Sequence, residues 1–169
     1  VGDVTLTVTG TCTIADAKTL TSAAAATLSC ASTTAVGYTI SAAGAVQVTG
    51  AWTGSGALLV TSSGSTVALN DDITTTGGSS DVGVTCSAGA LTLADTKTMT
   101  SAGTTTLSAQ SISSVAYTVS SAGAVAITGP WTATGAVSVA SSGSTITLND
   151  DIATGGSTKD LTIDANGAL

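Results

Sequence analysis

One eleven-residue segment occurs twice in this chain, and the spacing between its copies constrains the fold more than any other feature. SGSTVALNDDI occupies positions 63–73, and SGSTITLNDDI occupies positions 142–152, which gives a 79-residue offset. Trp52 and Trp131 keep the same spacing. Self-similarity at a fixed period indicates a repeat architecture, in which each unit buries its apolar face against its neighbours.

The repeat divides the 169 residues into residues 1–80, residues 81–159 and the start of a third copy, residues 160–169. Gly/Ser-rich segments at residues 77–80 and 155–157 separate the copies. The chain reads as a window cut from a longer array of 79-residue units. We therefore expect one continuous structure with no independent domains.

The residues within each repeat predict β-strands. Val4, Leu6 and Val8 alternate with threonines, and short runs of this kind are separated by Gly, Ser, Asn and Asp. A two-residue period bounded by turn residues is typical of strands, and no segment shows the 3.6-residue period of a helix. Abundant Thr, Val, Ser and Ala, together with 20 glycines, suit pleated surfaces and frequent turns.

A shorter spacing divides each repeat into coils. Met99, Val119 and Val139 are 20 residues apart at each step. We predict an all-β, right-handed parallel β-solenoid (β-helix) with about 20 residues per coil and about four coils per 79-residue repeat. A β-sandwich would also show turns about every ten residues. However, Asn-Gly and Asp-Gly hairpin turns are missing between the strands.

The short ALTL and GAVSV strands, the LNDDITTTGG turn and the Ala/Gly/Thr/Ser-rich filler resemble filamentous-haemagglutinin-type adhesins. These are giant bacterial surface and secreted proteins of the two-partner and autotransporter secretion classes, and the resemblance covers nearly the whole chain. It implies an extracellular or cell-surface location and a β-helical shaft. Low charge, 8% of the residues, and the lack of flexible linkers favour a structural role as a stiff, protease-resistant rod. We expect a host or neighbouring cell surface as a further partner.

The charges argue against several classes of function. The chain has ten Asp, three Lys and no Arg, Glu or His, with a net charge of −7. It has no basic patch to bind nucleic-acid phosphates or anionic membranes. No apolar run approaches the ~20 residues of a membrane-spanning helix.

The composition also argues against catalysis. Without His there is no general base near neutral pH, and no Cys–His pair can form. We therefore expect that the protein is not an enzyme.

Two Asn-Asp-Asp triplets are the best candidates for a ligand site: Asn70, Asp71, Asp72 and Asn149, Asp150, Asp151. Carboxylates on a loop can bind Ca²⁺, which takes six to eight oxygen ligands. Four coils separate the triplets by roughly 19 Å at the usual strand spacing, so they cannot share one ion. Asn and Asp are also favoured in turns, where their side chains hydrogen-bond the local backbone. We interpret the triplets as turns, keep calcium as the alternative, and expect no other cofactor.

The alternation places the aromatic residues and the cysteines in the core. Trp52 and Trp131 follow the phase of the inward apolar residues, and Tyr38 and Tyr117 are interpreted in the same way. The alternative for the tryptophans is a pair of exposed platforms that stack on sugars.

Three cysteines each lie two residues from an apolar neighbour, which places both on one face of a strand. They are Cys12, Cys30 and Cys86, and the second copy has Leu91 and Ala109 in place of the first two. We expect three inward, unpaired thiols. The 18-residue spacing of Cys12 and Cys30 nevertheless brings them close to one coil apart, within reach of a disulfide.

Two Asp-x-Lys segments predict exposed ion pairs, Asp16 with Lys18 and Asp95 with Lys97. The end coils of a solenoid expose unpaired backbone groups, so we expect partners stacked end to end. These partners are copies of this chain or further repeats of it.

The functional alternative to a shaft is an ice- or carbohydrate-binding solenoid. The fragments TLT, TMT and TIT suit an ice-binding face. In the sequence they do not recur at every coil, as a flat ice-binding face requires.

Overall fold

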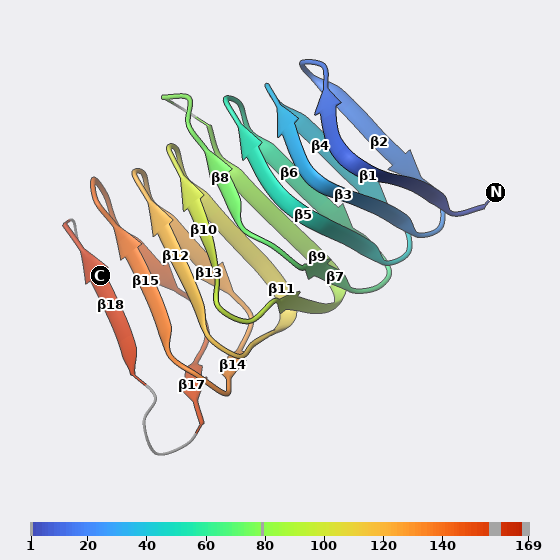
Figure 1. Ribbon diagram of the computed structural model, residues 1–169. Helices are drawn as coiled ribbons and strands as arrows, with labels where there is room; N and C mark the ends of the chain where they lie inside the picture. The colour runs from blue at the N-terminus through green and yellow to red at the C-terminus, as the bar shows by residue number, and fades with distance from the viewer. Residues whose placement is uncertain (1, 79, 156–159, 167–169) are drawn as a thin grey trace.

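The computed structural model describes residues 2–78, 80–155 and 160–166, and it contains only strands and turns there. Figure 1 shows the strands as coils stacked along one axis, with the two ends of the chain at opposite ends of the stack. Every strand pair is parallel. The predicted β-solenoid is confirmed, and it has about seven turns. Within the described ranges, no helix is long and apolar enough to cross a membrane.

The strands are β1 (Val4–Ile14), β2 (Lys18–Ser22), β3 (Ala26–Ala35), β4 (Tyr38–Ala42), β5 (Val46–Gly54), β6 (Leu58–Ser62), β7 (Val67–Leu69), β8 (Ile73–Thr75), β9 (Val82–Leu93), β10 (Lys97–Ser101), β11 (Thr105–Ser114), β12 (Tyr117–Ser121), β13 (Val125–Thr128), β14 (Trp131–Ala133), β15 (Val137–Ser141), β16 (Ile146–Leu148), β17 (Ile152–Thr154) and β18 (Leu161–Ala165).

Each complete coil has three strand segments, and segments of successive coils stack in register into three faces, which we call A, B and C. The long strands β1, β3, β5, β9 and β11 bend at a corner and contribute to two faces. Face A contains residues 4–8, 26–30, 46–49, β7, 90–93, 111–114, β14 and β17. Face B contains residues 11–14, 32–35, 51–54, β8, β10, β12, β15 and β18. Face C contains β2, β4, β6, 82–86, 105–109, β13 and β16.

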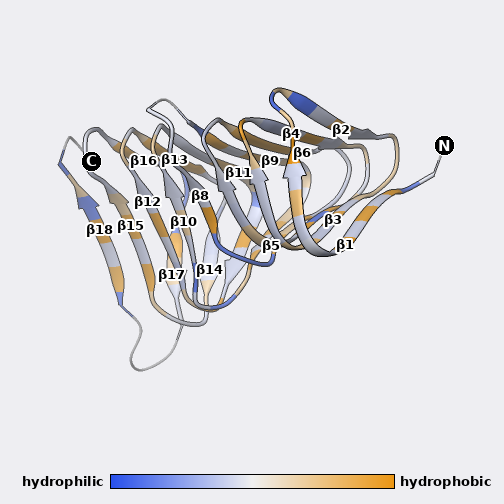
Figure 2. Ribbon diagram, turned by 45° about the horizontal axis from the view of Figure 1, so that its top comes forward, coloured by the Kyte–Doolittle hydropathy of each residue, from blue (hydrophilic) through white to orange (hydrophobic). Residues whose placement is uncertain are grey.

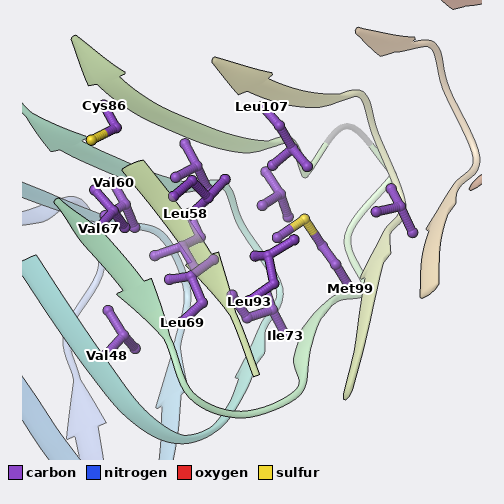
Figure 3. Close-up of a cluster of buried hydrophobic side chains, with 14 of the residues drawn as sticks. Val48, Leu58, Val60, Val67, Leu69, Ile73, Cys86, Leu93, Met99 and Leu107 are labelled. Atoms are coloured by element: carbon purple, nitrogen blue, oxygen red, sulfur yellow. The ribbon is translucent and has the colours of Figure 1, made fainter. Parts of the chain in front are cut away.

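The core runs along the axis of the coils. Side chains alternate between the inside and the outside of each strand, so that β4 and β12 show the same alternating burial. Apolar residues are distributed along the whole stack in Figure 2. Where the first copy meets the second, Leu69 and Ile73 pack beside Leu93 and Met99 (Figure 3). The two copies therefore share one uninterrupted core.

The 79-residue repeat does not contain a whole number of coils. Tyr38 lies in β4 on face C, whereas Tyr117 lies in β12 on face B. Trp52 lies on face B, and Trp131 lies on face A. Moving from β4 to β12 takes eleven strand segments, which at three segments per coil is three and two-thirds turns. The second copy is therefore rotated by one third of a turn relative to the first.

Coil length also varies around the value that the sequence predicts. Ser32 is stacked on Ala51, and the positions of these two residues differ by 19. Ile73 is stacked on Met99, and their positions differ by 26. The longer coil includes the Gly/Ser-rich segment between the two copies. Turns of different length absorb this variation, and the strands stay in register.

Candidate functional site

The Asn-Asp-Asp triplets occupy corners of the solenoid. Asn70 follows β7, so the first triplet lies at a corner between faces A and B, while Asn149 follows β16 at a corner between faces C and A. Asn70 Nδ2 donates a hydrogen bond to Thr49 Oγ1 at 3.0 Å. Asn149 Nδ2 donates to Thr128 Oγ1 at 2.8 Å. Both amides thus cross-link a corner to the preceding coil.

The first aspartate of each triplet accepts a hydrogen bond from a glycine one coil back. Asp150 Oδ2 accepts from the Gly129 N–H at 2.8 Å, and Asp71 has the same partner in Gly50. Both glycines have positive φ, 97° and 107°. A Cβ at Gly50 would lie 1.9 Å from the Cys30 carbonyl oxygen, so only glycine fits this close approach.

Among the described residues, Asp72, the second aspartate of the first triplet, accepts a hydrogen bond from the following coil and not from the preceding one. The Thr98 N–H donates to Asp72 Oδ1 at 2.8 Å, which joins the corner to the following coil. These bonds run to neighbouring coils, whereas the bond to the local backbone that the turn interpretation describes is the one that the Asp72 N–H donates to Asp71 Oδ1 at 3.3 Å. Within residues 2–78, 80–155 and 160–166, no group of three or more Asp or Cys residues is placed to hold a metal ion. Calcium binding stays an alternative for experiment.

The ion pair at the junction of the two copies differs from the prediction. Lys97 Nζ lies 2.8 Å from Asp71 Oδ1, whereas Asp95 Oδ1 accepts a hydrogen bond from the Ala116 N–H at 3.2 Å. The predicted Asp95–Lys97 pair is wrong because β10 stacks on β8, which places Lys97 one coil beyond the Asp71 corner. The predicted pair of Asp16 with Lys18 is also absent from the described part of the chain.

The Lys97–Asp71 contact changes the acidity of both groups. The hydrogen bond from Lys97 lowers the pKa of Asp71 below its ordinary value, and the same bond raises the pKa of Lys97. The exposed fraction of the side chain is 31% for Lys97 and 29% for Asp71. Solvent therefore screens the pair, and its contribution to stability is small.

Two of the three cysteines are paired, which corrects the prediction of three free thiols. Cys12 and Cys30 form a disulfide, with their Cα atoms 5.9 Å apart, and Cys86 is free and buried. The predicted inward orientation is confirmed for all three. Cys30 stacks on Val8 of face A, just before the corner that Cys12 follows, so the two sulfurs meet inside that corner. The spacing of 18 residues was the sequence signal for this pairing.

The aromatic residues lie in the core, as predicted. Trp52 is 1% exposed and Trp131 is 0% exposed, so neither ring can stack on a sugar as an exposed platform. Each packs against the tyrosine of its own copy, with ring centroids 5.8 Å apart for Tyr38–Trp52 and 6.5 Å apart for Tyr117–Trp131. All four rings are part of the buried core.

Face B brings together hydroxyl groups that are scattered in the sequence. Its second outward position in successive coils holds Thr13, Thr34, Thr53, Thr74, Thr100 and Ser120. Ala51 and Asp72 precede Thr53 and Thr74 by two residues, so the row consists of single hydroxyls, and Thr-x-Thr fragments do not recur at every coil of this face, as expected. Sequence reasoning missed this row because its members are unevenly spaced along the chain, so that no single period connects them.

A shallow groove lies on the same face. Its volume is about 310 Å³, and its floor includes the outward positions of four successive coils, Thr98, Thr118, Ser138 and Thr162. Hydroxyl groups in this groove can donate and accept hydrogen bonds. Lys97 and Asp160 also line the groove, so it presents both hydroxyl and charged groups.

Comparison with protein-family models, with curated proteins and with solved structures finds no match. The fold is compatible with the β-helical shafts of the adhesins that the sequence resembles.

Proposed function

We propose that this chain is a structural segment of an extracellular bacterial filament or giant adhesin shaft, and that it has no catalytic role. The observation that carries the proposal is the unbroken stacking across the boundary between the copies. Strand β9 of the second copy pairs with β6 and β7 of the first, and β10 pairs with β8. A boundary without a hinge gives a continuous rod.

Side chains reinforce this rod from coil to coil. Thr104 N–H donates to Asp81 Oδ1 at 2.8 Å, and Ala25 N–H donates to Asp3 Oδ1 at 3.1 Å. Each bond joins a corner to the next coil. In a solenoid, stability is roughly the sum of such nearest-neighbour terms, so added repeats extend the rod without changing its cross-section.

The disulfide supports a location outside the cytoplasm. Disulfides form and persist in oxidising compartments and are rare in reducing ones. The Cys12–Cys30 bond therefore fits the export that the adhesin resemblance implies. The partners in this proposal are further repeats or copies stacked end to end, and a host or neighbouring cell surface.

Two measurements test the shaft proposal. Proteinase K should leave the folded chain intact under conditions that digest the reduced, urea-unfolded chain, because stacked coils expose few segments to a protease. Antibodies against the chain should label intact, unpermeabilised cells of the source organism. Rapid digestion of the folded chain, or labelling only after permeabilisation, would rule the proposal out.

The threonine row on face B favours an ice-binding surface as the second candidate function. Stacked parallel strands space these hydroxyls at roughly 4.8 Å along the axis, which makes a regular array that can order water. The row extends from Thr13 to Ser120. A shaft needs no such regularity on one face.

Thermal hysteresis at millimolar protein tests this second candidate. If face B binds ice, the unmodified chain should show a gap between the melting and freezing temperatures, and the Thr53→Lys variant should abolish that gap. The matched control is Gln47→Lys on face A. Gln47 is exposed and lies outside the threonine row of face B, and it interrupts the outward hydroxyls of its own face. No hysteresis in the unmodified chain, or equal loss in both variants, would remove ice binding.

A further inference from the structure

We propose that the first copy binds one structural water molecule in its core, beside the indole ring of Trp52. The protein groups that bind it are the Trp52 indole N–H and the carbonyl oxygens of Ala35 and Gly56. Ala35 ends β3, and Trp52 lies in β5 of the following coil. The site therefore joins two coils that have neighbours on both sides in the stack. It is independent of the shaft function.

Two polar atoms in this region are buried without a protein partner. Thr33 and Trp52 are register partners in successive coils, and each is 1% exposed. Among the described residues, neither Thr33 Oγ1 nor Trp52 Nε1 has a hydrogen-bond partner. A buried polar group without a hydrogen bond costs free energy, so such groups are nearly always bonded to protein or to ordered water. These two atoms are the signal for a hydration site.

Gly54 leaves space for a molecule at this place. It is buried, and it lies two residues after Trp52 on the inward side of β5. A Cβ atom at position 54 would lie 3.0 Å from Trp52 Nε1, 3.3 Å from the Ala35 carbonyl oxygen and 3.4 Å from the Gly56 carbonyl oxygen. Because glycine has no Cβ, its own side chain does not fill the space that these polar atoms border. A buried water needs two to four polar partners, and these atoms supply them.

The donors and acceptors around this space select water. An indole N–H can only donate a hydrogen bond, and a carbonyl oxygen can only accept one. The Ala35 carbonyl oxygen already accepts from the Ser55 N–H at 3.0 Å, and its second lone pair is open to another donor. A water molecule accepts the indole proton and donates one proton to each carbonyl oxygen. A metal cation could not accept the indole proton, so it does not fit the site.

The second copy replaces each part of this site. The equivalent residues are Ile112 for Thr33, Ser114 for Ala35 and Ala133 for Gly54. There, Trp131 Nε1 donates directly to Ser114 Oγ at 2.9 Å. Ala133 is 0% exposed, so its methyl group occupies core space that Gly54 leaves open. The copy with a hydroxyl partner for the indole thus has neither the unpartnered threonine nor the glycine.

Water in the first copy takes the role that a side chain has in the second. Ser114 in β11 and Trp131 in β14 are in neighbouring coils, so their hydrogen bond links one coil to the next. In the first copy, the same link runs from Trp52 through water to the Ala35 carbonyl oxygen of the preceding coil. A bond through an ordered water is nearly as favourable in enthalpy as a direct one. Both copies therefore fasten the indole to the coil before it.

A crystal structure of the full chain, at a resolution that shows ordered waters, tests the site. We expect a density peak within hydrogen-bonding distance of Trp52 Nε1, and no such peak beside Ala133. The Gly54→Ala variant should lose the peak, because its methyl group takes the space. The Ala35→Ser variant should also lose it, because the new hydroxyl bonds the indole as Ser114 does. A map of the unmodified chain without a peak beside Trp52 would overturn the proposal.

Transfer of magnetisation from water to the indole proton tests the site in solution, even if Gly54→Ala fails to fold. The chain has two tryptophans, so isotope-labelled tryptophan gives two indole signals, which a Trp131→Phe variant assigns. The measurement uses Thr33→Val, which keeps the side-chain shape and removes a hydroxyl through which proton exchange could relay the signal. The Trp52 indole proton should still receive magnetisation from a long-lived water. No transfer in the folded Thr33→Val variant would overturn the proposal.

Discussion

Tyr38 and Tyr117 are equivalent residues of the two repeats, yet they lie on different faces of the solenoid, C and B. One sequence can serve two faces because all three faces have the same parallel stacking and the same alternation of inward and outward residues. Since each repeat turns by one third, a surface feature of the repeat would return to its starting face only after three repeats. Motifs such as Asn-Asp-Asp would therefore wind around a longer shaft.

The indole nitrogens of the two tryptophans differ in a way that predicts a stabilising mutation. Trp131 Nε1 donates to Ser114 Oγ at 2.9 Å, whereas the buried Trp52 Nε1 has no hydrogen-bond partner in the structure. The residue equivalent to Ser114 is Ala35. We expect Ala35→Ser to raise the free energy of unfolding by about 1 kcal/mol and Ser114→Ala to lower it by about 1–3 kcal/mol. Urea unfolding measures both, and two unchanged midpoints would contradict the assignment.

The sequence predicts which residues point inward better than it predicts which residues contact each other in neighbouring coils. Trp52 and Cys86 are placed correctly because alternation along one strand is a local property. The partner of Lys97 is a property of stacking, because the long coil between β8 and β10 places Lys97 beside Asp71. A uniform coil length therefore cannot predict the ion pair or the row of threonines. The disulfide likewise depends on which corner each cysteine flanks.

Reduction of the Cys12–Cys30 bond should destabilise the first two coils. A loop of this length contributes about 3 kcal/mol in the loop-entropy account, so a reductant should lower the urea midpoint. Alkylation after unfolding should detect one thiol without reductant and three with it. A Cys86→Ala control should detect none without reductant and keep the same sensitivity to reduction. Three thiols in the unreduced wild type would show that the bond is absent.

The Asp71–Lys97 pair should make stability depend on pH in acid. The folded-state pKa of Asp71 is lowered, so its stabilising contribution is present at neutral pH and is lost as pH falls through that lowered pKa. Asp71→Asn should therefore lower the melting temperature at pH 7 and have less effect near pH 2. Asp16→Asn, at an exposed residue without an ion pair in the described chain, is the control. A pH-independent difference between wild type and Asp71→Asn would contradict this account.

Calcium removal should leave the corners intact. The triplets are held by hydrogen bonds such as those from Asn70 to Thr49 and from Gly129 to Asp150, so a chelator should leave the melting temperature almost unchanged. A ligand bound only to the folded state raises stability with its concentration. A decrease of more than about 10 °C on chelation, reversed by added calcium, would favour calcium sites instead.

The central claim is that the two repeats form one parallel solenoid and meet with a rotation of one third of a turn. Thr74 of the first copy and Thr100 of the second are register partners across that junction on face B. Neighbouring strands lie about 4.8 Å apart, within the Cα separation that a disulfide accepts. In a Cys86→Ala background, Thr74→Cys with Thr100→Cys should therefore form a disulfide on mild oxidation. Thr74→Cys with Ala94→Cys, the pairing expected if this coil had the regular length that the sequence predicts, should not. A bond in the second pair and none in the first would contradict the account.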